Sequence, residues 1–290
     1  MTMQEQRGFF VAAGYQGQRI VSRNGRDWTN HEIGKEGEVY RTVAFGKERA
    51  VAVGSFGGSN IYTSSPDGKT WEPRGLKDAK YSSYIRGLCF GDGRFVAVGA
   101  DPVFSITSPD GLQWSDYKRF GENRQYQVLR RIVYGNGRYV AIGDLGRRST
   151  SKDGVDWTDH PKPEAAEALI DLAFGPGVFV GVGLHGLCMV SEDGLTWARR
   201  HSGEEGEHLN SVLWTGERFV AVAQGATYFS PDGIEWQRRP NTNAPLTAAY
   251  GAGVFVGAHW KGRLLASEDA LTWTQVFKSD HHFEVVAYGG

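Results

Sequence analysis

The sequence predicts an all-β protein: a seven-bladed β-propeller of four-stranded antiparallel blades, with the ring closed by the N- and C-terminal strands in one shared blade. Three observations lead to this prediction. A seven-residue segment ending in Trp recurs seven times, and a two-strand segment recurs in step with it six times. The missing copy of the two-strand segment is divided between the two ends of the chain. Glycine makes up 40 of the 290 residues, as tight turns between many short strands require.

The Trp-ending segment has the pattern Ser-x-Asp-Gly-x-x-Trp and predicts a tight turn between two strands. In such a turn Asp accepts backbone hydrogen bonds and Gly takes a left-handed conformation. The seven copies occupy 22–28, 65–71, 108–114, 151–157, 191–197, 230–236 and 267–273. Because all copies carry the same chemistry, we interpret the Asp as a turn residue and not as a catalytic or calcium-binding carboxylate. Asn24 replaces Asp in the first copy, and Ala270 replaces Gly in the last, where we expect strain or a different turn.

Each copy of the two-strand segment, such as LCFGDGRFVAVG (88–99), predicts two buried strands around a tight turn. A third strand leads into the Trp-ending turn, and a fourth begins at Trp. The run 285–290 supplies the first strand of the divided hairpin, and 7–14 supplies the second. Only 164–169 could form a helical turn. We expect a single domain with a tail at 1–6 and blades at 7–32 plus 283–290, 40–76, 83–121, 127–162, 168–201, 209–240 and 246–278.

Composition excludes several classes of protein. The net charge of −1 argues against a nucleic-acid binder, and no apolar run has the length of a membrane span. The first residues show no signal pattern, so we expect a cytosolic protein, or a secreted or periplasmic one whose signal has been removed. Two cysteines form no disulfide framework and no metal-ligand spacing. We expect a monomer without a cofactor or metal.

The repeated turns resemble the Asp-box, or bacterial neuraminidase repeat, superfamily of propellers, which includes sialidases, some xyloglucanases, sortilin-type receptors and a photosystem II assembly factor. The box here is one residue shorter than the family's. The resemblance covers the whole chain and implies the fold, whereas propellers host many unrelated functions. The family's sialidases carry an arginine in a Phe/Tyr-Arg-Ile-Pro motif. The nearest match here, Tyr40-Arg41-Thr42-Val43, lacks Ile-Pro, so sialidase activity is not expected.

One face of the propeller, here called the top face, carries the loops between the second and third strands and the linkers between blades. Counting back from each hairpin turn places one residue per blade at the top of the innermost strand: Arg41, Arg86, Arg130, Ile170, Asn210, Leu246 and Glu284. Three arginines at one level repel each other unless anions lie between them. Two interpretations stay open: a site for a carboxylate, sulfate or phosphate, or an Arg–Asp network that joins blades through Asp101, Asp144 and Asp171. Arg131 and the loop pair Arg147-Arg148 add charge.

Histidines and aromatic residues also map to the top face. The histidines are His185, His208, His259, His281 and His282. They are interpreted as ordinary loop residues, as a general acid or base, or as metal ligands if three converge. The aromatic residues are Tyr15, Tyr40, Phe56, Tyr81, Tyr84, Tyr126 and Trp260, a set that can stack on sugars or pack against a partner.

The favoured hypothesis is a binding propeller that captures an acidic glycan, an acidic peptide or a partner protein at the mouth of the central channel. Its expected contacts are Arg41, Arg86, Arg130, Arg131, Arg148, Tyr84, Trp260, His259, His282 and Glu284. One alternative is a carbohydrate-active enzyme, most plausibly a polysaccharide lyase acting on uronate-containing glycans, with His185, His208, His259 or Tyr84 as candidate catalytic groups. The other is a pure scaffold whose arginines are all paired.

Overall fold

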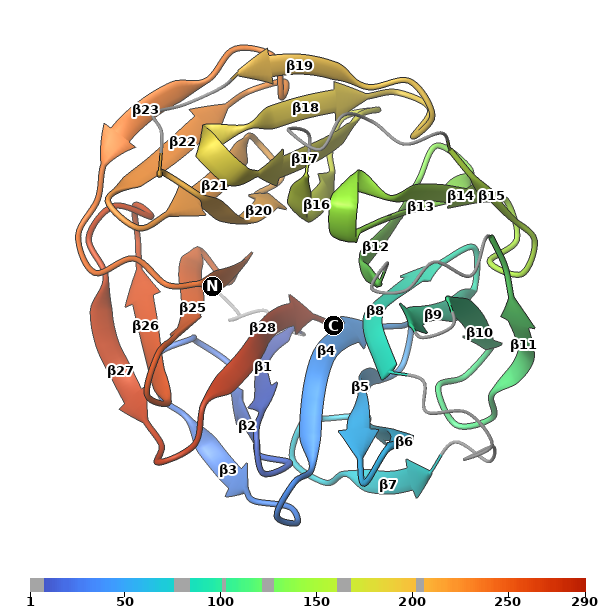
Figure 1. The fold of residues 1–290 in the computed structure, drawn as a ribbon. Helices are drawn as coiled ribbons and strands as arrows, with labels where there is room; N and C mark the ends of the chain where they lie inside the picture. Colours follow the sequence, from blue (N-terminus) through green and yellow to red (C-terminus); the bar gives the residue numbers. More distant parts are fainter. Residues whose placement is uncertain (1–7, 76–83, 101–102, 122–127, 161–167, 202–205) are drawn as a thin grey trace, which may run out of the picture.

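Seven four-stranded antiparallel sheets form a ring in the computed structural model (Figure 1). The structure describes residues 8–75, 84–100, 103–121, 128–160, 168–201 and 206–290. Asp101, Tyr81, Tyr126 and most of the expected helical turn at 164–169 lie outside these residues. The seven-bladed prediction is confirmed.

The blades follow one another along the chain, each starting with its innermost strand. Blade 2 is β4 (Val39–Phe45), β5 (Ala50–Phe56), β6 (Ser59–Ser65) and β7 (Glu72–Gly75). Blade 3 is β8 (Tyr84–Gly91), β9 (Arg94–Ala100), β10 (Phe104–Ser108) and β11 (Ser115–Arg119). Blade 4 is β12 (Leu129–Gly135), β13 (Arg138–Gly143), β14 (Arg148–Ser151) and β15 (Trp157–Asp159). Blade 5 is β16 (Leu169–Phe174), β17 (Phe179–Gly183), β18 (Cys188–Ser191) and β19 (Ala198–His201).

Blade 6 is β20 (Leu209–Trp214), β21 (Phe219–Ala223), β22 (Ala226–Ser230) and β23 (Gln237–Pro240). Blade 7 is β24 (Thr247–Gly251), β25 (Val254–His259), β26 (Arg263–Ser267) and β27 (Thr274–Lys278). Two 3-10 turns, η1 (Asp144–Gly146) and η3 (Leu184–Gly186), connect second to third strands on the top face. Among the described residues, no helix has the length and apolar character needed to cross a membrane.

Blade 1 joins the two ends of the chain. Its strands are β28 (Phe283–Gly289), β1 (Phe9–Gly14), β2 (Arg19–Ser22) and β3 (Thr29–Glu32). β28 pairs antiparallel with β1, from Phe9 opposite Gly289 to Gly14 opposite Phe283. The predicted closure of the ring by terminal strands is therefore confirmed, and no inner hairpin is left open at the seam.

The hydrophobic core consists of layers between neighbouring blades. In one layer, Val51 and Val53 of β5 pack with Ile85 and Phe95 of blade 3. In another, β28 and β1 bring Phe10 and Phe283 against Val256 of blade 7. Because the second strand of each blade is buried on both faces, its sequence is apolar at successive positions.

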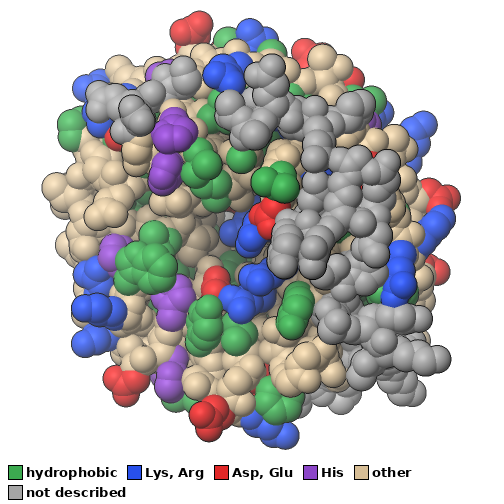
Figure 2. Space-filling view, in the orientation of Figure 1, with side chains coloured by type: hydrophobic (Ala, Val, Ile, Leu, Met, Phe, Trp, Pro, Cys, Tyr) green, Lys and Arg blue, Asp and Glu red, His purple; other side chains and the backbone are tan. Residues whose placement is uncertain are grey.

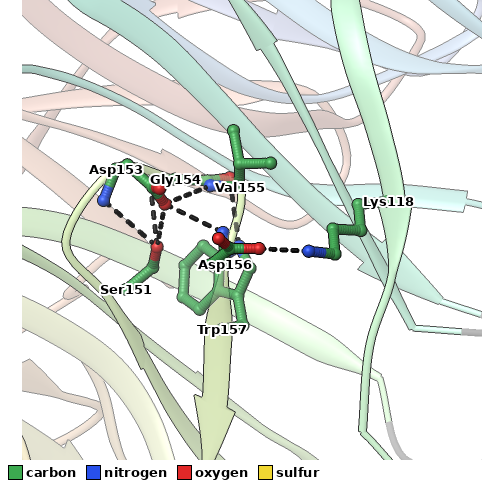
Figure 3. A network of polar contacts seen from close by, with 7 residues as sticks. All are labelled: Lys118, Ser151, Asp153, Gly154, Val155, Asp156 and Trp157. Atoms are coloured by element: carbon green, nitrogen blue, oxygen red, sulfur yellow. Dashed lines mark hydrogen bonds and ion pairs between the residues drawn. The ribbon is translucent and has the colours of Figure 1, made fainter.

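The repeated turns are built alike, as Figure 3 shows for the copy at 151–157. Asp153 Oδ1 accepts the N–H groups of Val155 and Asp156 at 2.9 and 2.8 Å, and the Ser151 hydroxyl accepts that of Gly154 at 2.8 Å. The Trp157 indole donates to the Gly154 carbonyl at 3.0 Å. Lys118 of β11 forms an ion pair with Asp156, which ties blade 3 to this turn.

Both deviating copies keep the turn. Asn24 substitutes its amide oxygen for the carboxylate and accepts the N–H groups of Arg26 and Asp27 at 2.9 and 2.8 Å. Ala270 adopts φ of 60°, the left-handed conformation that glycine takes in the other copies. The strain expected at Ala270 is therefore present in its backbone.

Candidate functional site at the channel mouth

A shared irregularity of the innermost strands positions the side chains at the channel mouth. In six blades the register between first and second strands shifts by one residue, as in a β-bulge. At each shift one residue of the first strand has no partner on the second strand. These residues are six of the seven that the sequence aligns at the top of the innermost strands: Arg41, Arg86, Arg130, Ile170, Asn210 and Glu284. In blade 7, Leu246 precedes β24, which pairs with β25 without a shift. Bulges turn a side chain away from the regular alternation of a strand, so these six residues share one orientation that ordinary strands would not give them.

A small residue on the second strand lies opposite each bulge: glycine in five of the six blades, and Ala223 in blade 6. At Gly99 an added Cβ would lie 2.0 Å from the Tyr84 carbonyl oxygen, and at Gly54 it would lie 1.8 Å from that of Val39. The close backbone approach at these two bulges therefore favours glycine at the end of the second strand.

Two of the three mouth arginines are neutralised. Arg41 forms an ion pair with Glu284, the bulge residue of the adjacent blade. Arg130 holds Asp144 of η1 with two donors, one of them Nη2 at 3.0 Å from Oδ2. The two carboxylates therefore compensate the charges on both sides of Arg86.

Arg86 lies between these two pairs and differs from them. In the part of the chain that the structure describes, its guanidinium has no hydrogen bond and no ion pair. Burial, followed by the positive charges of Arg41 and Arg130, lowers the pKa of Arg86. The three arginines are thus close enough to repel, and the central one is half-buried and forms no ion pair among the described residues.

Arg131 serves a structural purpose at the next position of β12. Its Nε lies 3.0 Å from Asp171 Oδ1, and Asp171 Oδ2 accepts the Val212 N–H at 2.9 Å. The contact continues from blade 4 through blade 5 to blade 6. The Arg–Asp interpretation therefore describes Arg130 and Arg131, whereas Arg86 forms no such pair among the described residues.

Aromatic rings and one imidazole extend the mouth toward blade 7. Trp260, with 58% of its surface exposed, stacks on His282 at a centroid distance of 5.3 Å and an angle of 19°. His282 also lies 5.8 Å from the Tyr15 ring, over which Arg41 packs at 5.2 Å. Figure 2 shows basic side chains, with acidic ones beside them, in the hollow at the centre of this face, and histidines along one side.

The other candidate histidines have local partners. His185 Nδ1 accepts the Gly206 N–H at 3.2 Å, and His208 Nδ1 accepts the His185 N–H at 3.3 Å. His259 lies beside Arg263, whose Nη2 is 2.7 Å from its Nδ1. Burial, then the charge of Arg263, lowers the pKa of His259, so the ring is neutral at pH 7. Among the described residues, no group of three His, Cys, Asp or Glu side chains has the arrangement of a metal site.

Tyr84 and Arg148, two further candidates for ligand contact, differ in their exposure to solvent. Tyr84, 42% exposed, begins β8 two residues before Arg86. Arg148, expected in a loop, instead begins β14 and is 7% exposed, with its guanidinium 5.3 Å from the Trp197 ring. Arg148 is buried between blades because β14 starts directly after η1, a turn that the sequence pattern did not reveal.

Comparisons with known proteins identify the fold. No family model matches the chain, and no curated protein matches it. Among solved structures, "YCF48 bound to D1 peptide" is 23% identical and has a TM-score of 0.61, with 81% of this chain and 80% of that one covered. YCF48 from Cyanidioschyzon merolae is 17% identical with a TM-score of 0.62, over 91% of this chain and 89% of that one. The computationally designed Ika8 protein is 15% identical with a TM-score of 0.58, over 96% and 86%.

Proposed function

We propose that this propeller is a binding protein that captures an anionic group of its ligand at the channel mouth, with Arg86 as the direct contact. The observation that carries the proposal is the contrast between Arg86 and its neighbours. Arg41 and Arg130 are each compensated by a carboxylate, whereas Arg86 has no partner among the described residues. A buried charge without a partner is costly, and a ligand carboxylate, sulfate or phosphate removes that cost through two parallel hydrogen bonds.

The surroundings of Arg86 favour a ligand larger than a single ion. Tyr84 and Tyr15 are 42% and 39% exposed, and Trp260 extends the aromatic surface toward blade 7. Aromatic rings beside an arginine are typical of the centre of protein interfaces. A structural neighbour, YCF48, is described as bound to a peptide, which supports a peptide or protein ligand for a propeller of this shape. We therefore place an acidic peptide or partner protein first and an acidic glycan second.

The test compares two arginines on opposite faces. Arg86→Ala should weaken binding of acidic peptides and acidic oligosaccharides on the order of tenfold to a hundredfold, as loss of a charge-assisted contact does. Arg138→Ala is the matched control, since Arg138 lines a groove with Asp153 and Asp156 on the face of the repeated turns. Titration calorimetry over both ligand classes decides the matter. Equal affinities of wild type and Arg86→Ala across the panel would place the site elsewhere.

The lyase alternative rests on the position of Tyr84. A lyase needs a cation against the uronate carboxylate and a base for the neighbouring proton, and Tyr84 precedes Arg86 on β8. Incubation with a panel of uronans should then produce the ultraviolet absorbance of an unsaturated product, which Tyr84→Phe abolishes. A flat absorbance trace over the whole panel rejects this alternative and leaves the binding proposal intact.

A further inference from the structure

A second cavity lies on the top face away from the channel, between blades 1 and 2. Its volume is about 350 Å³, within the range of small-molecule sites. Residues from β2, β4, β5 and β6 and from the linker before β4 line it: Arg19, Lys35, Glu38, Tyr40, Phe56 and Tyr62. None of these belongs to the mouth described above.

Arg19, one of the lining residues, is an incompletely satisfied cation. The Arg19 side chain is 9% exposed, and its Nη2 lies 2.7 Å from Glu32. Its Nη1 donates to the Gly17 carbonyl at 2.7 Å and lies 3.8 Å from Glu38. The Nε of Arg19 is buried and has no hydrogen-bond partner among the described residues. Buried donors of this kind are rare and call for an acceptor.

Beside Arg19 the chain makes room for a carboxylate. Glu38 accepts the Lys35 N–H at 3.0 Å and packs on Gly17 and Gly34, where an added Cβ would lie 2.6 and 2.5 Å from the carboxylate. Burial raises the pKa of Tyr40, whose hydroxyl interacts with both Glu38 and Arg19. The lining thus offers donors and acceptors side by side.

The walls are aromatic. Phe56 is 38% exposed at the end of β5, with Lys35 Nζ 5.9 Å from its ring centre. The Tyr62 hydroxyl donates to the Leu112 carbonyl at 2.7 Å, so this residue presents its ring to the cavity rather than its hydroxyl. The lining therefore combines aromatic rings with charged and polar groups.

Two cations, Arg19 and Lys35, and one anion, Glu38, line the cavity, and Glu32 outside the lining pairs with Arg19. Both glutamates lie against Arg19, and the four formal charges sum to zero, so a charged ligand would leave one charge uncompensated. A carbohydrate ring meets the remaining requirements, because it is uncharged, carries hydroxyls that both donate and accept, and has an apolar C–H face for an aromatic wall. We propose that the cavity between blades 1 and 2 binds a neutral sugar, independently of the anion site at Arg86.

The experiment measures binding of uncharged sugars to the full chain. The probes are the methyl glycosides of glucose, galactose, mannose and xylose and their uncharged oligomers, followed by titration calorimetry and saturation-transfer NMR. At least one probe should bind the wild type, and Phe56→Ala should weaken it on the order of tenfold through loss of the stacking wall. Phe56→Trp should retain binding.

Two control variants keep the result interpretable. Tyr117→Ala removes an aromatic ring of equal exposure, 38%, from β11 of blade 3, and should leave sugar binding unchanged. Arg86→Ala should also leave it unchanged, because the mouth is a separate site. The proposal is overturned if no uncharged sugar binds, if Phe56→Ala binds as well as wild type, or if Arg86→Ala abolishes binding.

Discussion

Arg41 and Glu284 form an ion pair across the seam between blade 2 and the terminal strand β28, each from the bulge of its own innermost strand. The side chains are 19% and 26% exposed, so the pair is only partly screened by water. Arg41 also packs on the Tyr15 ring at 5.2 Å. This pair neutralises one positive charge near Arg86, so its loss should change the affinity of the mouth for anionic ligands.

Glu284→Gln should strengthen anion binding. The substitution removes a negative charge and leaves Arg41 and Arg86 both available, so affinity for an acidic peptide should rise several-fold at low salt. Glu284→Asp, which keeps the charge, is the control. Calorimetric titrations at two ionic strengths give the comparison, and weaker binding by Glu284→Gln would mean that Glu284 itself contacts the ligand.

Stability should fall steeply in acid because of the repeated turns. Burial would raise the pKa of Asp153, but hydrogen bonds from Asp156, Val155 and Ser151 lower it below 3.8 overall. The same net lowering occurs at Asp67, Asp110, Asp193, Asp232 and Asp269. Groups with a depressed folded pKa stabilise the fold above their unfolded pKa, and this contribution is lost as the pH falls through the folded value. The free energy of unfolding should therefore drop from about pH 5 downward.

Asp153→Asn tests that origin of the acid sensitivity. The natural Asn24 turn indicates that an amide oxygen can accept the same backbone hydrogen bonds, so the variant should fold. The free energy of unfolding of the variant should depend less steeply on pH between about pH 5 and 2, since one titrating carboxyl has been removed. Urea unfolding at a series of pH values supplies both curves. If the free energy of unfolding changed with pH by the same slope in wild type and Asp153→Asn, other groups would account for the acid sensitivity.

Gly99→Ala should disturb both stability and the mouth. The added Cβ would lie 2.0 Å from the Tyr84 carbonyl oxygen, so the bulge that carries Arg86 must shift. We expect a loss of about 1–3 kcal/mol in the free energy of unfolding, as for other overpacked sites, together with weaker anion binding. Gly75→Ala is the matched control, because an added Cβ there meets no atom within 4 Å. A Gly99→Ala variant as stable as that control would contradict the close approach.

Trp260 fluorescence should report the protonation of His282. Burial lowers the pKa of His282 below 6.5, with Glu284 acting in the opposite direction and Arg41 in the same one. Its imidazole is therefore neutral at pH 7 and gains a proton only at lower pH, directly against the stacked indole. The difference in emission between wild type and Trp260→Phe should change with a midpoint below pH 6.5. His282→Gln should remove the transition, and its persistence in that variant would point to another group.

Much of the fold follows from the sequence because each blade repeats the same local chemistry. The turn residues Asp153 and Gly154 and the partly buried Trp157 recur at one spacing, which defines blade number and closure. The residues at the mouth could also be aligned, since Arg41, Arg86 and Arg130 stand at one distance from their hairpin turns.

The pairing of those arginines could not be predicted. Asp144 meets Arg130 only because η1 turns its carboxylate back toward β12, and Glu284 meets Arg41 only once the ring is closed. The bulge itself has no sequence signature beyond the small residue opposite it, glycine in five blades and Ala223 in blade 6, and such a residue is equally compatible with an ordinary strand end. The stacking of Trp260 on His282 likewise depends on the backbone conformation of two separate loops, which local sequence patterns do not determine.

The residues at the mouth come together only when β28 has paired with β1 and closed blade 1. Of the propeller's strands β28 comes last in the chain, and it carries Glu284 and follows His282 directly. Until it pairs with β1, Arg41 lacks its carboxylate and Trp260 lacks the imidazole beneath it. A chain in which β28 has not yet paired therefore has a more positive mouth, because Glu284 does not yet offset the charge of Arg41.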